Sequence, residues 1–158
     1  MEVVHRIYDQ NPPVAIGADV MVGFPGETEK DFEKTVQFLE GLPLAYLHVF
    51  SFSPRSGTPA AGFSDQVDGW VKKARSRQMR LLSRQKRIVF RSRFIGKELE
   101  ALVLNQAGPK PGYRVALTGN YIPVFVEAGQ AQVNHMVMVK LLKVNKHEAW
   151  GSVISIVN

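Results

Sequence analysis

The chain has 158 residues, of which 45% are hydrophobic and 22% are charged, and it carries a formal net charge of +6. This length and composition suit one ordinary globular domain or two small ones and exclude a chain dominated by disorder. The sequence contains no cysteine, which excludes disulfides, thiolate metal sites, iron–sulfur ligation and cysteine nucleophiles within the chain.

Membrane insertion and export are also disfavoured. No apolar run approaches the roughly 18 residues of a membrane span, and the first residues, MEVVHRIYDQNPP, lack the layout of a signal peptide. The sequence therefore predicts a soluble, cytoplasmic protein with no membrane partner.

The charge is concentrated in one segment. Residues 1–69 hold four Lys or Arg and ten Asp or Glu, whereas residues 70–97 hold eleven basic residues and no acid. Residues 98–158 hold five basic and four acidic residues. A solvated helix face is one interpretation of the basic segment, but eleven cations without one acid in the same segment repel one another, so we favour a polyanionic partner.

The first part of the chain predicts a helix, a strand and a second helix. A helical pattern over 2–10 ends at Asn11-Pro12-Pro13, and an apolar strand follows over 16–22. Within this strand Asp19 should point toward a polar interior or a ligand. A Gly-Phe-Pro-Gly turn then leads to Thr28-x-x-Asp31, a capping-box-like helix start.

This second helix is expected to end near Leu42, before Pro43, and a second apolar strand covers 45–52. Strand, helix and strand with short connections indicate a parallel sheet of the β/α type. Residues 53–65 then form a loop rich in Gly, Pro and Ser.

One long helix is predicted from about Gln66 to Ile95, closed by Gly96. Its apolar residues recur at three- and four-residue spacing and should form one side: Val67, Trp70, Val71, Ala74, Leu81, Leu82, Ile88, Val89 and Ile95. The basic residues should form the opposite side: Lys72, Lys73, Arg75, Arg77, Arg80, Arg84, Lys86, Arg87, Arg91 and Arg93.

The rest of the chain predicts a small β-domain. Five short strands, expected to be antiparallel, are separated by turns rich in Gly and Asn and cover 99–104, 113–117, 121–126, 136–142 and 149–156. Such a set suits a Greek-key barrel of OB-like type. The predicted domains are therefore residues 1–65, the basic connecting helix 66–95, and the barrel 96–158, and a basic helix leading into a small barrel indicates RNA binding.

Most candidate sites have a plain structural interpretation. The GFPG loop offers amides to an anion, but a simple turn is favoured, and the lysine of a nucleotide P-loop is missing. His48, flanked by Leu47 and Val49, is expected to be a buried core histidine, and no metal ligands accompany it. Arg55 follows the end of a parallel strand, where barrel enzymes keep their active sites, so function and a structural salt bridge are equally supported.

Two long motifs carry a family resemblance. DVMVGFPGETEKDF (19–32) and YLHVFSFSPRSGTPAA (46–61) resemble the radical S-adenosylmethionine methylthiotransferases, which attach a methylthio group to modified adenosines in tRNA. The resemblance continues through the basic helix and FIGKELEALV (94–103). It ends in a barrel that looks like a TRAM domain, the RNA-binding module of the family, notably at GNYIPVFV (119–126).

Within the family, HVFSFSPRSGTPAA looks most like the branch that acts on threonylcarbamoyladenosine beside the anticodon. The isopentenyladenosine branch is a near neighbour, and a third branch modifies a ribosomal protein. The rival outside the family is a stand-alone RNA-binding module without catalysis.

The resemblance implies roles for particular residues. Those matching the segments that contact S-adenosylmethionine are Met21, Val22, Gly23, Phe24, Glu27, Phe52, Ser53 and Pro54. Those expected to face the substrate or RNA are Arg55, Gly57, Thr58, Arg80, Arg84, Arg87 and Tyr121.

The resemblance also implies a missing part. The family's enzymes use S-adenosylmethionine and two 4Fe–4S clusters held by cysteines, which this sequence lacks. We therefore interpret the chain as a C-terminal fragment: the last part of a radical-type TIM-like (β/α) barrel followed by an all-β, OB-like TRAM barrel. It should be inactive alone, bind the tRNA anticodon stem-loop, and need the N-terminal domains of the same enzyme for catalysis.

This interpretation predicts a difference in stability. Two strands and a helix cannot close an eight-stranded (β/α) barrel, so the strands at 16–22 and 46–52 should have bare edges and uncovered faces. Residues 1–65 should then be less stable than the TRAM barrel, or be completed by self-association.

Overall fold

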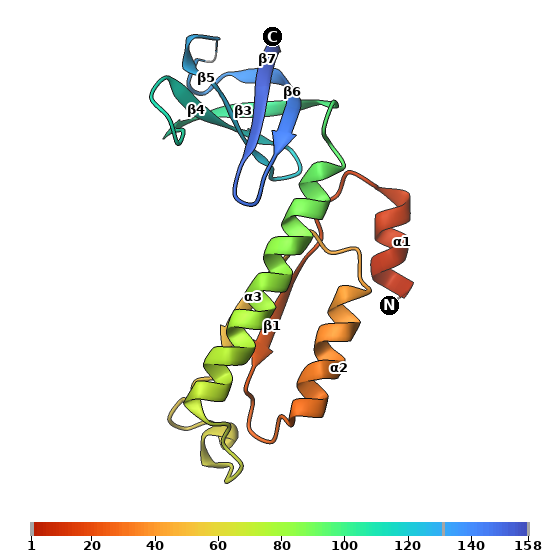
Figure 1. The fold of residues 1–158 in the computed structure, drawn as a ribbon, viewed down its shortest axis with the longest axis vertical. Helices are drawn as coiled ribbons and strands as arrows, with labels where there is room; N and C mark the ends of the chain where they lie inside the picture. The colour runs from red at the N-terminus through yellow and green to blue at the C-terminus, as the bar shows by residue number, and fades with distance from the viewer. Residues whose placement is uncertain (1, 131, 158) are drawn as a thin grey trace. The chain divides into compact units, whose positions relative to one another are not determined.

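The computed structural model describes residues 2–130 and 132–157, and the chain divides into two compact units, Met1–Lys86 and Arg87–Asn158. Unit 1 contains helices and a small parallel sheet, and unit 2 contains a β-barrel (Figure 1). The helix α3 (Gly69–Ser92) begins in unit 1 and ends in unit 2.

Unit 1 follows the predicted β/α order. After α1 (Glu2–Gln10), the strand β1 (Gly17–Val22), the helix α2 (Glu29–Glu40) and the strand β2 (Tyr46–Ser51) form one parallel βαβ unit, with Met21 beside Phe50. A short 3-10 helix, η1 (Pro59–Gly62), interrupts the loop before α3. The parallel pairing confirms the sequence prediction, because a helix between two strands returns the chain in the same direction.

The start of α2 follows from its capping residues. The Thr28 hydroxyl accepts a hydrogen bond from the Asp31 backbone N–H at 3.2 Å, and the Asp31 carboxylate accepts one from the Thr28 backbone N–H at 3.3 Å. This reciprocal pair is a capping box and confirms the predicted start. The hydrogen bonds with the Thr28 side chain and backbone lower the pKa of Asp31.

Only one face of the β1–β2 sheet is covered. Val20, Val22 and Leu47 point into a core formed with Phe32 and Leu39 of α2 and with Met79 and Leu82 of α3. On the opposite face Met21 and Phe50 are 55% and 52% exposed. The expectation of uncovered faces is therefore confirmed for one face of the sheet, while α2 and α3 cover the other.

The expectation of a buried core histidine at position 48 is wrong. His48 is exposed, because it pairs in register with Asp19 on the open face of the sheet, and its ring meets that of Tyr46 edge-on at 5.1 Å. Apolar neighbours in the sequence did not indicate burial here, because successive strand residues point to opposite faces.

The predicted division of α3 into an apolar and a basic side is also wrong. Arg75 and Lys86 are buried at 5% and 9% exposure, whereas Trp70 and Val89 are 73% and 67% exposed. The buried side of α3 therefore contains polar and charged side chains as well as Met79 and Leu82.

Hydrogen bonds to backbone explain this burial. The Lys86 ammonium donates to the Leu42 carbonyl at 2.8 Å and to the Glu40 carbonyl at 3.2 Å, where α2 ends. The Ser83 hydroxyl accepts from the Leu47 N–H and donates to the Leu47 carbonyl, both at 2.9 Å, and so satisfies part of the outer edge of β2. Burial lowers the pKa of Lys86, with Glu40 opposing that shift.

Unit 2 is a closed five-stranded barrel with the strand order β3-β4-β5-β7-β6. Its strands lie at the predicted positions: β3 (Glu98–Ala107), β4 (Tyr113–Thr118), β5 (Pro123–Glu127), β6 (Met136–Val144) and β7 (Ala149–Ile156). A 3-10 turn, η2 (Ala128–Gln130), follows β5. The prediction of wholly antiparallel strands is wrong in one place, because β5 and β7 pair in parallel at Phe125 and Trp150 to help close the barrel.

The barrel interior is filled by small and branched side chains. Val103, Val124, Val126, Val137 and Val139 are fully buried, and along β3, β5 and β6 they alternate with less buried residues, which is the period of two that a closed sheet requires. Among the described residues, no helix is long and apolar enough to cross a membrane.

Candidate cofactor pocket and nucleic-acid interface

A pocket of about 350 Å³ opens at the carboxyl end of β1 and β2. It is lined by Met21, Phe50, Ser51, Phe52, Ser53, Arg55, Thr58 and Ala60. The lining combines apolar and aromatic side chains with three hydroxyls and one guanidinium. Such a pocket suits a ligand with a flat or apolar body and an anionic group.

Five of the residues expected at the cofactor or substrate line this pocket together: Met21, Phe52, Ser53, Arg55 and Thr58. Phe50, Ser51 and Ala60 were missed. Phe50 could have been found from the register of the parallel strands. It pairs with Met21 across the sheet and therefore lies on the same face.

The loop after β2 fixes the position of Arg55. The Thr58 backbone N–H and hydroxyl both donate to the Arg55 carbonyl, at 3.1 and 2.8 Å. Gly57 between them has φ of +81°, a conformation that other L-residues rarely adopt. The tight turn leaves the Arg55 side chain exposed, and neither of the two salt bridges found in the described part of the chain involves it.

The remaining predicted cofactor residues lie behind the pocket or away from it. Val22 is 1% exposed on the covered face of the sheet, so its side chain belongs to the core. The Phe24 ring packs edge-on against Phe52 at 5.2 Å and against Phe63 at 6.4 Å. Phe24 therefore supports a pocket wall, while Pro54 is exposed outside the lining, as is Gly57, which was predicted to face the substrate.

The Gly23 and Gly26 amides of the GFPG loop, and the Glu27 amide that follows it, are hydrogen-bonded within the chain. The Gly23 N–H donates to Glu27 Oε2 at 2.6 Å, the Gly26 N–H donates to the Asp65 carbonyl at 2.9 Å, and the Glu27 N–H donates to the Phe24 carbonyl at 2.9 Å. These donors are not available to an anion, which supports the interpretation of this loop as a turn.

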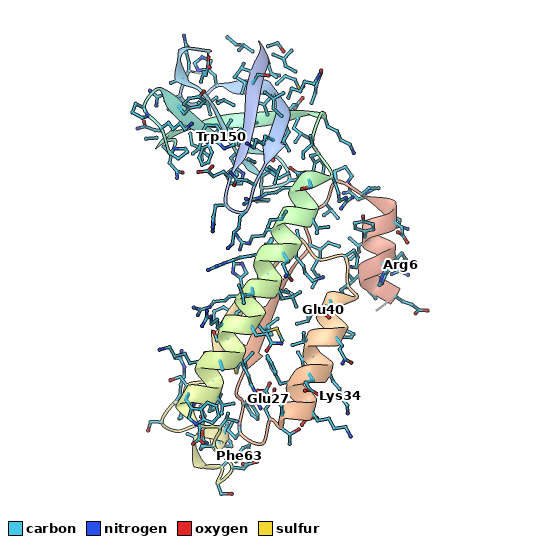
Figure 2. The ribbon with its side chains drawn as sticks, in the orientation of Figure 1. Arg6, Glu27, Lys34, Glu40, Phe63 and Trp150 are labelled. Atoms are coloured by element: carbon cyan, nitrogen blue, oxygen red, sulfur yellow. The ribbon has the colours of Figure 1, made fainter. Side chains whose placement is uncertain are left out.

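Glu27 and Arg75 tie this loop to α3. Arg75 Nη1 donates to Glu27 Oε2 at 2.7 Å and to the Glu27 carbonyl at 2.9 Å, and Nη2 donates to Glu29 Oε2 at 3.0 Å. Burial lowers the pKa of Arg75, but the hydrogen bonds to Glu29 and Glu27 outweigh it, so the pKa is raised. Figure 2 shows Glu27 and Phe63 toward the same end of unit 1.

The sequence predicted Arg75 to be on the basic side of the helix, available to RNA, but the structure pairs it with acidic residues of unit 1. Its two partners are Glu27 and Glu29, which follow the GFPG turn, and the next acidic residue, Asp31, belongs to the capping box.

A basic stripe runs along the exposed side of α3, consisting of Lys73, Arg77, Arg80, Arg84 and Arg87, all exposed. Their spacing of four and three residues places them in one row, and the 100° turn per residue puts that row opposite the side that carries Met79 and Arg75. The predicted RNA-facing residues Arg80, Arg84 and Arg87 therefore share one exposed row. Arg91 is half-buried, and burial together with the charge of Arg87 lowers its pKa.

Tyr121 belongs to unit 2, in the turn between β4 and β5. Its side chain is 76% exposed and its φ is +61°.

Trp150 of unit 2 is less exposed than Tyr121 (Figure 2 labels Trp150). The centre of its ring lies 5.1 Å from that of Tyr113 and 5.2 Å from that of Phe125, and the Lys110 ammonium lies 5.3 Å from the centre of the Trp150 ring.

The residues 2–130 and 132–157 contain no group of three or more His, Asp or Glu side chains placed to hold a metal ion.

Two curated proteins are similar in sequence. The threonylcarbamoyladenosine tRNA methylthiotransferase MtaB of Aquifex aeolicus is 38% identical over 138 residues, which is 87% of this chain and 32% of that protein. The tRNA-2-methylthio-N(6)-dimethylallyladenosine synthase of Anaplasma phagocytophilum is 33% identical over 162 aligned positions, covering all of this chain and 36% of that protein. No family model matches the chain.

The chain thus spans about a third of the length of these relatives, and the similarity covers both the pocket loops of unit 1 and the barrel of unit 2 in the second alignment. The resemblance stated from the two motifs is confirmed: the chain belongs to the methylthiotransferase family that these two relatives represent.

Proposed function

We propose that this chain is the C-terminal part of a tRNA methylthiotransferase that modifies threonylcarbamoyladenosine beside the anticodon. The observation that carries the proposal is the convergence of both family motifs on one pocket, which Met21 of β1 and Arg55 after β2 line together. The 38% identity to a relative named for threonylcarbamoyladenosine supports this branch.

In this proposal unit 1 is the last part of a radical S-adenosylmethionine barrel, and its pocket supplies part of the cofactor site. The pocket fits that group: Phe52 and Met21 offer apolar contact to an adenine ring, and the Arg55 guanidinium offers charge-assisted hydrogen bonds to a carboxylate or a phosphate. When bound with its clusters, S-adenosylmethionine supplies radical chemistry. This chain has no cysteine to hold a cluster, so the clusters are assigned to protein segments outside it, and the chain alone is expected to be inactive.

The cofactor part of the proposal is tested by titrating the chain with S-adenosylhomocysteine while recording NMR spectra. We expect weak binding that perturbs Phe52 and Ser53, and a further loss of affinity in Arg55→Ala. The matched control is Arg6→Ala, an exposed arginine on α1 (Figure 2). No perturbation at the pocket, combined with retained RNA binding, would favour a stand-alone RNA-binding module.

The basic stripe and the barrel, which we identify with a TRAM domain, are proposed to hold tRNA. Phosphate contacts of this kind fix orientation and not sequence. If the five stripe cations each neutralise one phosphate, the slope of log K against log salt should include about −4 from the stripe. The acid-free run from 70 to 97 supports this use of the helix.

The RNA part is tested by titrating full tRNA and an unmodified anticodon stem-loop across salt concentrations. In the triple variant Arg80→Glu, Arg84→Glu, Arg87→Glu, we expect affinity to fall at least a hundredfold and the salt slope to become shallower. The control Arg6→Glu, Lys30→Glu, Lys34→Glu makes the same change in net charge on exposed positions of α1 and α2. Equal losses in both variants would contradict a specific role for the stripe, and binding to a ribosomal protein but not to tRNA would favour the third branch of the family.

A further inference from the structure

Thr118 forms several hydrogen bonds within the turn between β4 and β5. The Tyr121 backbone N–H donates to the Thr118 carbonyl at 2.9 Å, and the Ile122 N–H donates to the Thr118 hydroxyl at 2.9 Å. The Thr118 N–H returns a hydrogen bond to the Ile122 carbonyl at 3.1 Å, and the Thr118 hydroxyl donates to Asn120 Oδ1 at 2.6 Å. Thr118 and Ile122 are 3% and 1% exposed, so both ends of the turn are anchored in the barrel.

Between these anchors Tyr121 adopts an unfavourable backbone conformation. Its φ of +61° lies in the left-handed region, which bulky L-residues avoid because Cβ crowds the carbonyl oxygen. Glycine or asparagine would occupy this position at lower cost. The only other non-glycine residue with positive φ in the described part of the chain is Asn134, a residue type that tolerates it.

The Tyr121 ring brings no compensating contact within the fold. It is 76% exposed, and across residues 2–130 and 132–157 no aromatic contact, hydrogen bond or ion pair of its side chain is found. A residue that costs stability and buries little is best explained by a contact with something outside the chain.

We propose that Tyr121 is a stacking platform for an unpaired nucleobase of RNA. The inference rests on the proposed RNA binding and deepens it, because it assigns one barrel side chain to a base where the helix stripe is assigned to phosphates. Unit 2 carries nine Lys or Arg against four Asp or Glu, so its field favours a polyanion, and a flat ring standing out of such a surface suits a base. The base is unpaired, because bases inside a duplex already stack on their neighbours and leave no free face.

The test uses the full chain with two RNA probes, an anticodon stem-loop and a blunt duplex of equal phosphate number. In Tyr121→Asn we expect about tenfold weaker binding to the stem-loop and unchanged binding to the duplex, because stacking on one aromatic ring has this magnitude. Tyr121→Phe keeps the ring and should bind within twofold of the parent. Because the removed group is uncharged, the salt slope should stay the same in Tyr121→Asn, whereas it becomes shallower in the arginine variant.

Thermal unfolding supplies the second readout. Tyr121→Asn should unfold at the same temperature as the parent or higher, since asparagine relieves the left-handed conformation. The matched control Asn134→Gly relieves positive φ without removing a ring and should leave RNA affinity unchanged. A lower unfolding temperature with unchanged RNA affinity would assign Tyr121 to folding and overturn the proposal.

The outcomes separate the two proposals. If the parent chain binds neither probe at low salt, the proposed RNA binding fails. If the parent binds and Tyr121→Asn binds the stem-loop equally well, the stacking site alone is overturned.

Discussion

The two units of this chain bury their sheets in opposite ways. In unit 2 the barrel closes on itself, so each strand has two neighbours and residues such as Val124 and Val139 are enclosed. In unit 1 the sheet has two strands, covered on one face by α2 and α3, while Met21 and Phe50 remain exposed on the other. The difference shows that a closed sheet can bury its apolar side chains against one another without help from helices. The open two-stranded sheet leaves apolar side chains exposed beside its pocket.

The largest effect is expected when the chain is cut before α3, so that the part of unit 1 that precedes α3 is separated from that helix. A fragment of residues 69–158 keeps all of α3 and the barrel, and it should fold with a cooperative unfolding transition. A fragment of residues 1–68 loses Met79 and Leu82 from its core and should not fold. Calorimetry on both fragments checks this. A sharp unfolding transition in residues 1–68 would contradict the claim that this part of unit 1 depends on α3 for its core.

Loss of the buried ion pair should destabilise unit 1 alone. Arg75→Ala leaves the Glu27 carboxylate, whose side chain is 13% exposed, without its cation. We expect a loss of about 3 kcal/mol in the free energy of unfolding of unit 1. Urea titrations in Trp150→Phe and Trp70→Phe backgrounds report on units 1 and 2 separately, since one tryptophan lies in each.

The control for this prediction is Arg77→Ala, an exposed arginine two residues away, which should change stability by less than about 0.5 kcal/mol. An equal loss in both units on Arg75→Ala would show that they unfold together and would remove the contrast between them.

Self-association should depend on the open face of unit 1. Phe50→Ser removes a large apolar side chain that is 52% exposed there, and we expect any dimer to weaken about tenfold. Sedimentation velocity over a range of concentrations measures this. The exposed Leu142 of the barrel offers a control, since Leu142→Ser should leave the association unchanged.

The smallest effect concerns the helix cap in unit 1. Thr28→Ala removes the hydroxyl of the capping box and should cost about 1 kcal/mol at neutral pH. The pKa of Asp31 is lowered in the folded state by its hydrogen bonds with Thr28. Its stabilising contribution is therefore present above the unfolded pKa and is lost as the pH falls through the folded pKa. The gap between parent and variant in urea titrations should shrink on acidification, and a constant gap would contradict this linkage.

The sequence predicted the order and limits of the elements well, because turns and caps act locally. The GFPG turn, the capping box at Thr28 and the five barrel strands are each set by residues within a few positions. The pocket was partly predicted: the motifs brought Met21, Phe52 and Arg55 together, while Phe50 required the register between β1 and β2.

Burial on α3 was beyond the sequence pattern. Arg75 and Lys86 are buried because they donate hydrogen bonds to carboxylates and backbone carbonyls of distant segments. Hydrophobic periodicity carries no information about such partners. The same limit explains His48, whose face depends on which side of the sheet the helices cover. The parallel closure by β5 and β7 likewise follows from the whole barrel and not from any one turn.

Hydrogen exchange on the full chain, with and without the anticodon stem-loop, tests the contrast between the units most directly. We expect the slowest exchange in β3 to β7 and faster exchange in β1 and β2, with added RNA slowing exchange in α3 and in the turn at Tyr121. Uniform protection across both units of a monomer, unchanged by RNA, would contradict both the open, less stable sheet and the RNA-binding surfaces assigned here.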